Sequence, residues 1–265
     1  MSLYQLYAYY YATSLLFLSV TFFICKEHQF ITNTKQLSWI LTGVSSLVCS
    51  IASLPRMYRF WKSGYDMYWL ALNSNNDIAL VCFFQIYLFL DLALGYRYYK
   101  KQIRWVTGWF HHSMYLILLC WFLKKRIASF FVTAAILELP TLILSIGSLY
   151  PKYRSDHLFA ISFFILRLVF HTSMIRLLKH HHHIKSLWLV ALAILPLHLY
   201  WFYGIMTLQV RKFKGKYLSS SPSVVSITTP STTIDPISTT TAVAASTATL
   251  LLNESRVMDK AMSTI

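Results

Sequence analysis

Several polar side chains interrupt stretches that are otherwise apolar enough to enter a bilayer. Glu138 occurs within VTAAILELPTLILSIG, Arg167 within FAISFFILRLVFHTSM, and His111 and His112 open FHHSMYLILLCWF. An arginine or an acid at the centre of a transmembrane helix costs roughly 2.5–3.5 kcal/mol on insertion scales. Such residues usually face a charged partner or a wet cavity. The sequence therefore predicts a polar site at the centre of a membrane protein.

The adjacent histidines His111 and His112 could supply acid–base or nucleophilic chemistry. A neutral imidazole can accept a proton near neutral pH or act as a nucleophile. Neighbouring residues on a helix point about 100° apart, so at most one of the two can face the bundle interior squarely. We take both as candidate catalytic residues. The alternative is a pair that anchors the helix end at the membrane surface.

Further polar residues are candidates for the lining of a lipid-binding cavity. Arg167 and His171 are four residues apart and share a helix face, where they could hold an anionic headgroup or the phosphate of an acyl donor. Glu138 could orient a histidine or bind a cationic or hydroxyl group, or it could form a structural ion pair with Arg167. Asp91 could close the polar network from the cytosolic side. His198 could join the cavity or bond to a backbone carbonyl freed by a nearby proline.

Cysteine and histidine spacing predicts no metal site. Four cysteines lie within apolar stretches without a CxxC pair, which is typical of packing residues; they are Cys25, Cys49, Cys82 and Cys120. The run from His180 to His183 lacks a second set of ligands, so we expect it to be a solvated loop. We expect no cofactor, apart from acyl-CoA as a co-substrate if the protein is an acyltransferase.

The composition defines the elements that must position these residues. Hydrophobic residues make up 56% of the chain and charged residues 12%, about half the charged fraction of a soluble domain. The apolar runs are continuous and do not alternate as in a β-barrel. The fold class is therefore all-α, a polytopic membrane bundle of about seven helices. We place them near residues 4–25, 38–54, 77–95, 109–123, 128–149, 157–178 and 187–208.

Local signals refine these boundaries. The run from Asn73 to Asp77 is rich in helix caps and supports the start of the third span. Pro55 is expected to end the second span, because proline cannot continue the helical hydrogen bonding. The fourth span is short and is expected to extend toward Trp105. Pro140 and Pro196 fall inside the fifth and seventh spans, where neighbouring helices can satisfy the freed carbonyls.

The net charge of +15 favours a membrane surface over nucleic acid as the partner. Lysine and arginine occur in short runs between apolar stretches, such as KKQIR, KKR and RKFKGK, where basic residues orient helices and contact headgroups. With the N-terminus outside, the cytosolic segments carry twelve lysines and arginines and the opposite side carries eight. This bias predicts a cytosolic C-terminus.

The chain divides into three regions by composition. Residues 1–37 hold a first transmembrane helix and a loop, and residues 38–216 form the remaining transmembrane domain. Residues 217–265 are rich in serine and threonine with scattered proline, a composition typical of disorder.

The polar residues, taken in order, resemble the TLC domain family, which includes translocating-chain-associated membrane proteins and ceramide synthases. The likeness covers about half of the chain, from about residue 83 to 211, and is closest to the small TLC-domain proteins of fungi and animals. It rests on Asp91 with GYRYYKK, on WFHHSMY, on ELPT, on RSDHLFAISFFILRLVF and on LHLYWF.

The resemblance implies a bundle of about six spans around a lipid-accessible cavity, usually in the endoplasmic reticulum. In ceramide synthases the paired histidines support acyl transfer from acyl-CoA to a sphingoid amine, and His111 and His112 are the matching positions. The chain departs from that pattern at Tyr115, where ceramide synthases have threonine. LELPTLILSIG, with Glu138 as its one acid, also replaces their second motif of histidine and two aspartates. These departures weigh against ceramide synthesis.

Three functions remain open from the sequence. The first is a lipid-handling membrane protein that binds a phospholipid, sphingolipid or acyl chain and influences membrane lipid composition. The second is an acyl-CoA-dependent lipid acyltransferase that uses the histidine pair. The third is a non-catalytic chaperone, cargo or translocon-associated factor, in which the polar residues join helices. Membrane lipids, and other membrane proteins of the endoplasmic reticulum, are the expected partners.

Overall fold

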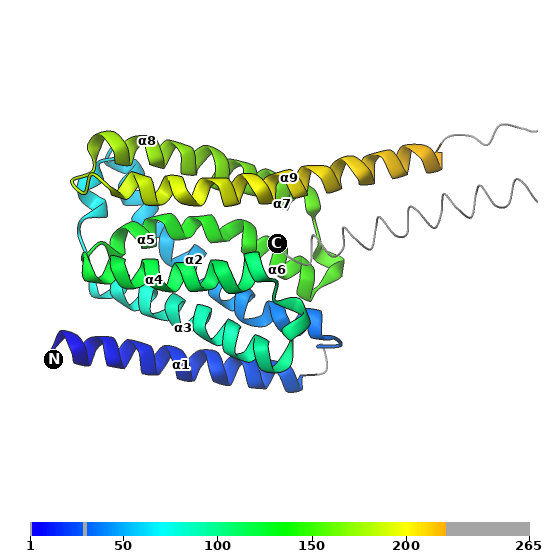
Figure 1. Ribbon diagram of the computed structural model, residues 1–265, viewed down its shortest axis with the longest axis horizontal. Coiled ribbons are helices and arrows are strands. Elements are labelled where there is room, and N and C mark those ends of the chain that lie inside the picture. Colours follow the sequence, from blue (N-terminus) through cyan, green and yellow to red (C-terminus); the bar gives the residue numbers. More distant parts are fainter. Residues whose placement is uncertain (1, 29–30, 221–265) are drawn as a thin grey trace, which may run out of the picture. The chain divides into compact units, whose positions relative to one another are not determined.

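The computed structural model describes residues 2–28 and 31–220, with the side chains of residue 107 and of residues 215–220 left aside. Every regular element among these residues is helical (Figure 1). The prediction of an all-α membrane bundle is therefore confirmed. Six helices are long and apolar enough to cross a membrane: Leu3–Glu27, Thr34–Lys62, Asn75–Tyr98, Ala128–Leu149, Asp156–His181 and Leu187–Lys214. The protein is a multi-pass integral membrane protein.

In the labels of Figure 1, α1 is Leu3–Glu27, α2 is Thr34–Lys62 and α3 is Asn75–Tyr98. Helix α4 is His111–Lys124, α5 is Ala128–Ala134 and α6 is Leu139–Leu149. Helix α7 is Asp156–Phe163, α8 is His171–His181 and α9 is Leu187–Ser220. Residues up to Phe202 form one compact unit, and residues from Tyr203 onward belong to a second. All contacts described below lie within the first unit.

The helix starts carry the capping residues expected from their chemistry. Ser2 and Gln5 form a reciprocal capping box at α1, and Ser74 and Asp77 form another at α3. Asn33 caps α2 through its side chain. These side chains satisfy backbone N–H groups that have no partner within the helix. The cap-rich run that precedes the third span is thus confirmed as a helix start.

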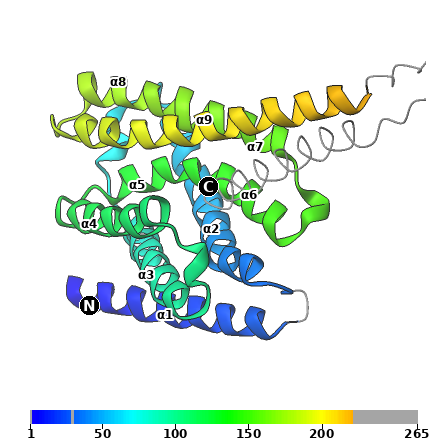
Figure 2. The same cartoon turned by 45° about the vertical axis from the view of Figure 1, so that its right-hand side comes forward.

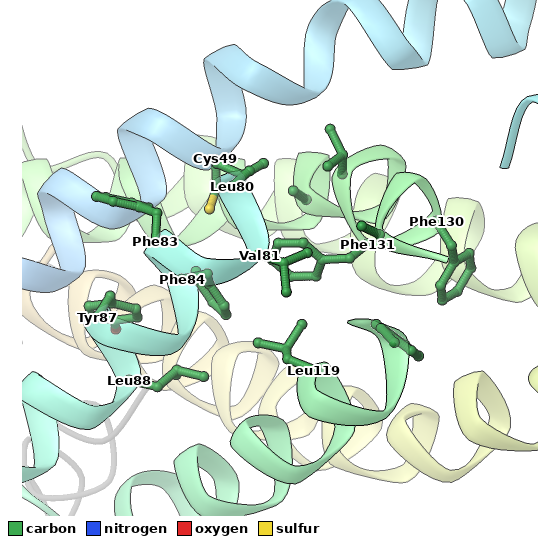
Figure 3. Close-up of a cluster of buried hydrophobic side chains, with 14 of the residues drawn as sticks. Cys49, Leu80, Val81, Phe83, Phe84, Tyr87, Leu88, Leu119, Phe130 and Phe131 are labelled. Carbon is green, nitrogen blue, oxygen red and sulfur yellow. The ribbon is translucent and has the colours of Figure 1, made fainter. Parts of the chain in front are cut away.

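The core forms where α2, α3, α4 and α5 meet. Helix α1 packs along α3, and α2 contacts α3, α5 and α6 (Figures 1 and 2). Figure 3 shows side chains from these four helices converging, including Cys49, Val81, Leu119 and Phe131. Helix α1 buries a stripe at every fourth residue, Ser14, Leu18 and Phe22, while many of its other apolar side chains are exposed, as lipid contact requires.

Three irregular helical segments interrupt the bundle. Trp105–Phe110 and Phe164–Phe170 are π-helical, and Ala135–Glu138 is a 3₁₀ turn between α5 and α6. Pro140 lies in the first turn of α6, where its missing N–H is not needed. Such departures leave backbone groups that are not hydrogen-bonded along their own helix. Each of the three segments carries or directly precedes one of the polar residues predicted for the cavity.

Two predicted boundaries were wrong. Helix α2 continues through Pro55 to Lys62. The proline removes one hydrogen bond, but its ring lies on an exposed face and the helix resumes on both sides. Helix α9 runs on to Ser220, past the predicted end of the seventh span, so residues 217–220 of the predicted tail are helical. The rest of that tail, 221–265, lies outside the described residues.

The fourth predicted span corresponds to the π-helical segment Trp105–Phe110 followed by α4. It begins at Trp105, as expected. Ile103, just before it, packs between two glycines that leave no room for a side chain. A Cβ on Gly95 would lie 2.0 Å from the Ile103 Cδ1, and a Cβ on Gly108 would lie 2.3 Å from its Cγ2. Ile103 therefore fixes the start of the fourth span against α3.

Candidate functional site

A cavity of about 80 Å³ lies among α3, α4, α5, α8 and α9 and the irregular segments between them. Its wall is mostly apolar, with Phe84, Leu118, Phe122 and Met174 among its residues. Five of the seven predicted site residues also line it: His111, Glu138, Arg167, His171 and His198. We call these five residues the cavity cluster. They come from positions up to 87 residues apart in the chain, from His111 to His198.

Arg167 is the centre of the cavity cluster. Its side chain is buried, with a relative exposure of 8%. Its Nη2 donates to the Glu138 Oε1 at 3.3 Å and to the Thr141 Oγ1 at 2.7 Å, and its Nε donates to the Leu137 carbonyl at 3.0 Å. The guanidinium also lies over the rings of Phe163 and Trp201, at 5.4 and 5.5 Å from their centroids. A buried cation needs such a set of partners.

Glu138 links Arg167 to a second helix. Its Oε2 accepts a hydrogen bond from the Ser46 hydroxyl of α2 at 3.2 Å. The ion pair between Glu138 and Arg167, which was one of the alternatives predicted for Glu138, is thus present. The 3₁₀ turn that carries Glu138 also presents the Leu137 carbonyl toward Arg167, so the irregular backbone supplies part of the site.

His171 and His198 face one another across α8 and α9. Their Nδ1 atoms are 2.9 Å apart, and the His198 Nδ1 is also 3.1 Å from the Arg167 carbonyl oxygen. Because that carbonyl can only accept, we assign a proton to the His198 Nδ1 and a lone pair to the His171 Nδ1. The carbonyl that His198 meets belongs to the π-helical segment and not to the turn above Pro196, which corrects that part of the sequence interpretation.

His111 occupies the cavity wall without a hydrogen bond to any described residue. Its ring is held by aromatic contacts, 4.6 Å from the ring of Tyr115 and 5.3 Å from that of Trp201. Its Nδ1 is buried and has no partner among the described residues, and the same is true of the Trp201 Nε1. His111 is thus fixed in position while its hydrogen-bonding capacity is unsatisfied.

His112 and Asp91 do not line the cavity. The His112 Nε2 lies 3.7 Å from the Asp91 Oδ2, and the Tyr99 hydroxyl donates to the Asp91 Oδ1 at 2.8 Å. Burial, and after it the Asp91 carboxylate, raises the pKa of the Tyr99 hydroxyl, which keeps this donor protonated. We call Asp91, Tyr99 and His112 the Asp91 cluster. The adjacent histidines therefore diverge, with His111 toward the cavity and His112 toward α3.

The histidine run spans the end of α8 and the bend after it, and three of its four side chains are exposed, as predicted for a solvated segment, whereas the fourth is not. His180 and His181 belong to α8 and are exposed, whereas His182 is fully buried. The His182 Nδ1 accepts the backbone N–H of Ile184 at 3.0 Å. Burial, with a smaller effect of His183, lowers the pKa of His182 to about 4. Within the described residues no group of three or more metal-ligand side chains occurs.

The sequence interpretation missed three neighbours of the cavity cluster, of which Tyr115 also lines the cavity. Thr141 lies three residues after Glu138, and Trp201 lies three residues after His198, so helical spacing could have placed each on the same face as its neighbour. Tyr115 lies four residues after His111 and contacts its ring. Their proximity to Arg167 depends on contacts between helices and is not visible in the sequence.

The arrangement can orient a small polar group within an otherwise apolar space. No family model, curated protein sequence or solved structure matches the chain.

Proposed function

We propose that the protein binds a membrane lipid in this cavity and thereby influences membrane lipid composition. The observation that carries the proposal is the composition of the cavity wall, which is apolar over most of its surface and polar at the cavity cluster. Small-molecule sites typically combine a largely apolar lining with a few placed polar groups. A lipid tail matches the first part and a lipid polar group matches the second.

The dimensions favour a single chain over a whole phospholipid. His111 and Phe122, both on the cavity wall, are eleven residues apart on α4, or about 16 Å along the helix axis. That is about half the thickness of a bilayer's hydrocarbon core. The cavity volume of about 80 Å³ suits part of one chain and is too small for two chains with a large headgroup.

Two alanines on α9 offer a matched test. Ala191 is buried on the cavity wall, and Ala193, two residues later, is exposed. We expect Ala191→Phe to remove lipid that co-purifies with the full-length protein and Ala193→Phe to leave it, as measured by mass spectrometry of washed, detergent-purified samples. Equal lipid in both variants, or none above detergent background in the wild type, would contradict the proposal.

The cellular readout is the lipidome of cells that lack the protein, rescued with each variant at matched abundance. Rescue by Ala193→Phe but not by Ala191→Phe would link the cavity to lipid composition. An unchanged lipidome in the deletion would favour a non-catalytic chaperone, cargo or translocon-associated role.

A second candidate function is acyl transfer, and one observation favours it. His111 presents an imidazole with no hydrogen bond to described residues, as a general base or a nucleophile needs. Acyl-CoA would then be the co-substrate. Glu138 would not orient this base, because its partners are Ser46 and Arg167. Loss of acyl transfer in His111→Ala, with activity kept in His112→Ala at equal expression, would support this function.

The likeness to the TLC domain family supports placement in the endoplasmic reticulum, and the Lys and Arg distribution supports a cytosolic C-terminus. Membrane lipids, and other membrane proteins of that organelle, would be the partners. Protease protection of a C-terminal epitope in sealed microsomes tests the orientation. An epitope that resists protease until the membrane is opened would contradict it.

A further inference from the structure

The charges on the cavity wall already balance. Glu138 and Arg167 are the acidic and basic side chains among its lining residues, and they pair with each other. A phosphate or a carboxylate entering the cavity would add a net negative charge to a site of low dielectric constant. A protonated amine would add a net positive charge beside Arg167. Either ion would lose its hydration without a counter-charge, which is costly.

One residue of the cavity wall, His111, has unsatisfied hydrogen-bonding capacity, because its buried Nδ1 has no partner in the described chain. A neutral imidazole offers one donor and one acceptor. By contrast, His171 and His198 bond to each other, and Arg167 bonds to Glu138, Thr141 and the Leu137 carbonyl.

An uncharged group that both donates and accepts fits beside this imidazole. A hydroxyl can exchange a hydrogen bond with the His111 imidazole, and it adds no charge. We infer that the lipid carries an uncharged hydroxyl as its polar group, as long-chain alcohols and acylglycerols do, and that His111 binds that hydroxyl. This inference rests on the proposed lipid-binding function and names the class of lipid.

The test compares headgroups on one chain length. Full-length protein in detergent micelles is labelled with a photoreactive, clickable analogue of hexadecanol. Unlabelled hexadecanol, palmitate and palmitoyl lysophosphatidate are then added as competitors near neutral pH. We expect hexadecanol to displace the label at a concentration at least about tenfold below that of either anion, the difference that one hydrogen bond and one uncompensated charge can produce.

Substitutions identify the residues responsible. His111→Phe keeps an aromatic ring but no hydrogen bond, and we expect hexadecanol to bind about tenfold more weakly. His111→Gln retains a donor and an acceptor and should bind within a few-fold of wild type. His112→Gln is the neighbouring control outside the cavity and should bind as the wild type does. Each variant is compared at equal monodispersity and melting temperature.

The outcomes separate this inference from the proposed function. Equal displacement by all three competitors, with labelling still lost in Ala191→Phe, would overturn the hydroxyl inference and leave lipid binding in place. Stronger displacement by either anion, or unchanged hexadecanol binding in His111→Phe, would also overturn it. The absence of saturable labelling by the hexadecanol analogue would overturn the hydroxyl inference, and the lipid that co-purifies with the wild type but not with Ala191→Phe would decide the proposed function separately.

Discussion

His111 and His112 are neighbours in the chain, yet they belong to two polar clusters of different construction. His111 lines the cavity without a hydrogen bond to described residues, whereas His112 faces Asp91 outside it. The cavity cluster depends on irregular backbone, with Glu138 on a 3₁₀ turn and Arg167 in a π-helical segment. The Asp91 cluster joins α3 to α4. Asp91 lies within α3, Tyr99 is the residue at the C-terminal cap of α3, and His112 lies in the first turn of α4.

The two clusters separate a cavity within the bundle from a joint between helices. In the Asp91 cluster, a carboxylate, a hydroxyl and an imidazole meet across a regular helix pair, and none of them lines the cavity. In the cavity cluster, backbone groups displaced from regular helical bonding help to hold Arg167 and His198, and His111 faces the space that remains. We therefore expect the first cluster to contribute to stability and the second to both stability and binding.

The largest effect is expected at Arg167. Arg167→Met leaves the Glu138 carboxylate and the Leu137 carbonyl without their main partner, which should cost about 3–5 kcal/mol of unfolding free energy. Thermal unfolding in detergent measures the loss. Arg176→Met, at an exposed position of α8, is the control and should change little. The double variant Arg167→Met/Glu138→Gln should recover part of the lost unfolding free energy, because it removes the unpaired charge of Glu138. No recovery would contradict the ion-pair explanation.

Tyr99 tests the Asp91 cluster in isolation. Tyr99→Phe removes the hydroxyl that donates to Asp91 and should cost about 1–3 kcal/mol, because a buried carboxylate loses a hydrogen bond. Lipid that co-purifies with the variant, measured at a temperature where it stays folded, should match the wild type. A variant that is stable but has lost its lipid would break the separation between the two clusters.

Gly108 tests whether the π-helical entry to α4 positions His111. Gly108→Ala places a Cβ 2.3 Å from the Ile103 Cγ2 and should cost about 1–3 kcal/mol through overpacking. Because His111 follows this segment directly, lipid binding should fall as well. Ile103→Ala in the same chain removes the clashing carbon. If the double variant binds no better than Gly108→Ala, steric displacement is not the cause.

The smallest effect concerns His182, a histidine beyond the membrane-spanning helices, which serves as a reference for the histidines within the bundle. Its pKa of about 4 in the folded state lies below the value of about 6.5 expected after unfolding. Its contribution to stability is therefore complete above about pH 6.5 and is lost as the pH falls toward 4. We expect a loss of about 1 kcal/mol near pH 5.5.

His182→Asn keeps an acceptor for the Ile184 N–H and removes the titration. Its melting temperature should depend less on pH than that of the wild type over this range. If the melting temperature of the variant depends on pH as strongly as that of the wild type, groups within the bundle are responsible for this pH dependence.

Much of the fold could be predicted because insertion into lipid imposes a simple pattern. Six of the seven predicted apolar runs became helical segments long enough to cross a membrane, and the caps at Ser74 and Asp77 followed from local chemistry. Helix ends were less predictable. Pro55 was expected to end a helix, yet α2 continues on both sides of it. The π-helical and 3₁₀ segments could not be predicted, because their hydrogen bonds depend on partners from other helices.

The candidate site was predictable in part for a related reason. A charged residue in an apolar run must find a partner, which identifies Glu138 and Arg167 without a structure. Which of two adjacent histidines faces the cavity depends on the rotation of α4, and the packing of Ile103 against Gly95 and Gly108 constrains the segment that precedes it. The sequence gives no direct measure of that rotation.

The most direct test of lipid binding in the cavity is to map where a bound lipid chain lies. A lipid with a photoreactive group in the middle of its chain is crosslinked to the full-length protein in membranes, and the modified residues are identified by peptide mass spectrometry. We predict saturable adducts on the cavity wall of α4, α5 and α9, near Leu118, Ala134 and Ala191, that disappear in Ala191→Phe but persist in Ala193→Phe. Adducts confined to outward-facing residues such as Phe17 and Ile161, unchanged in either variant, would contradict it.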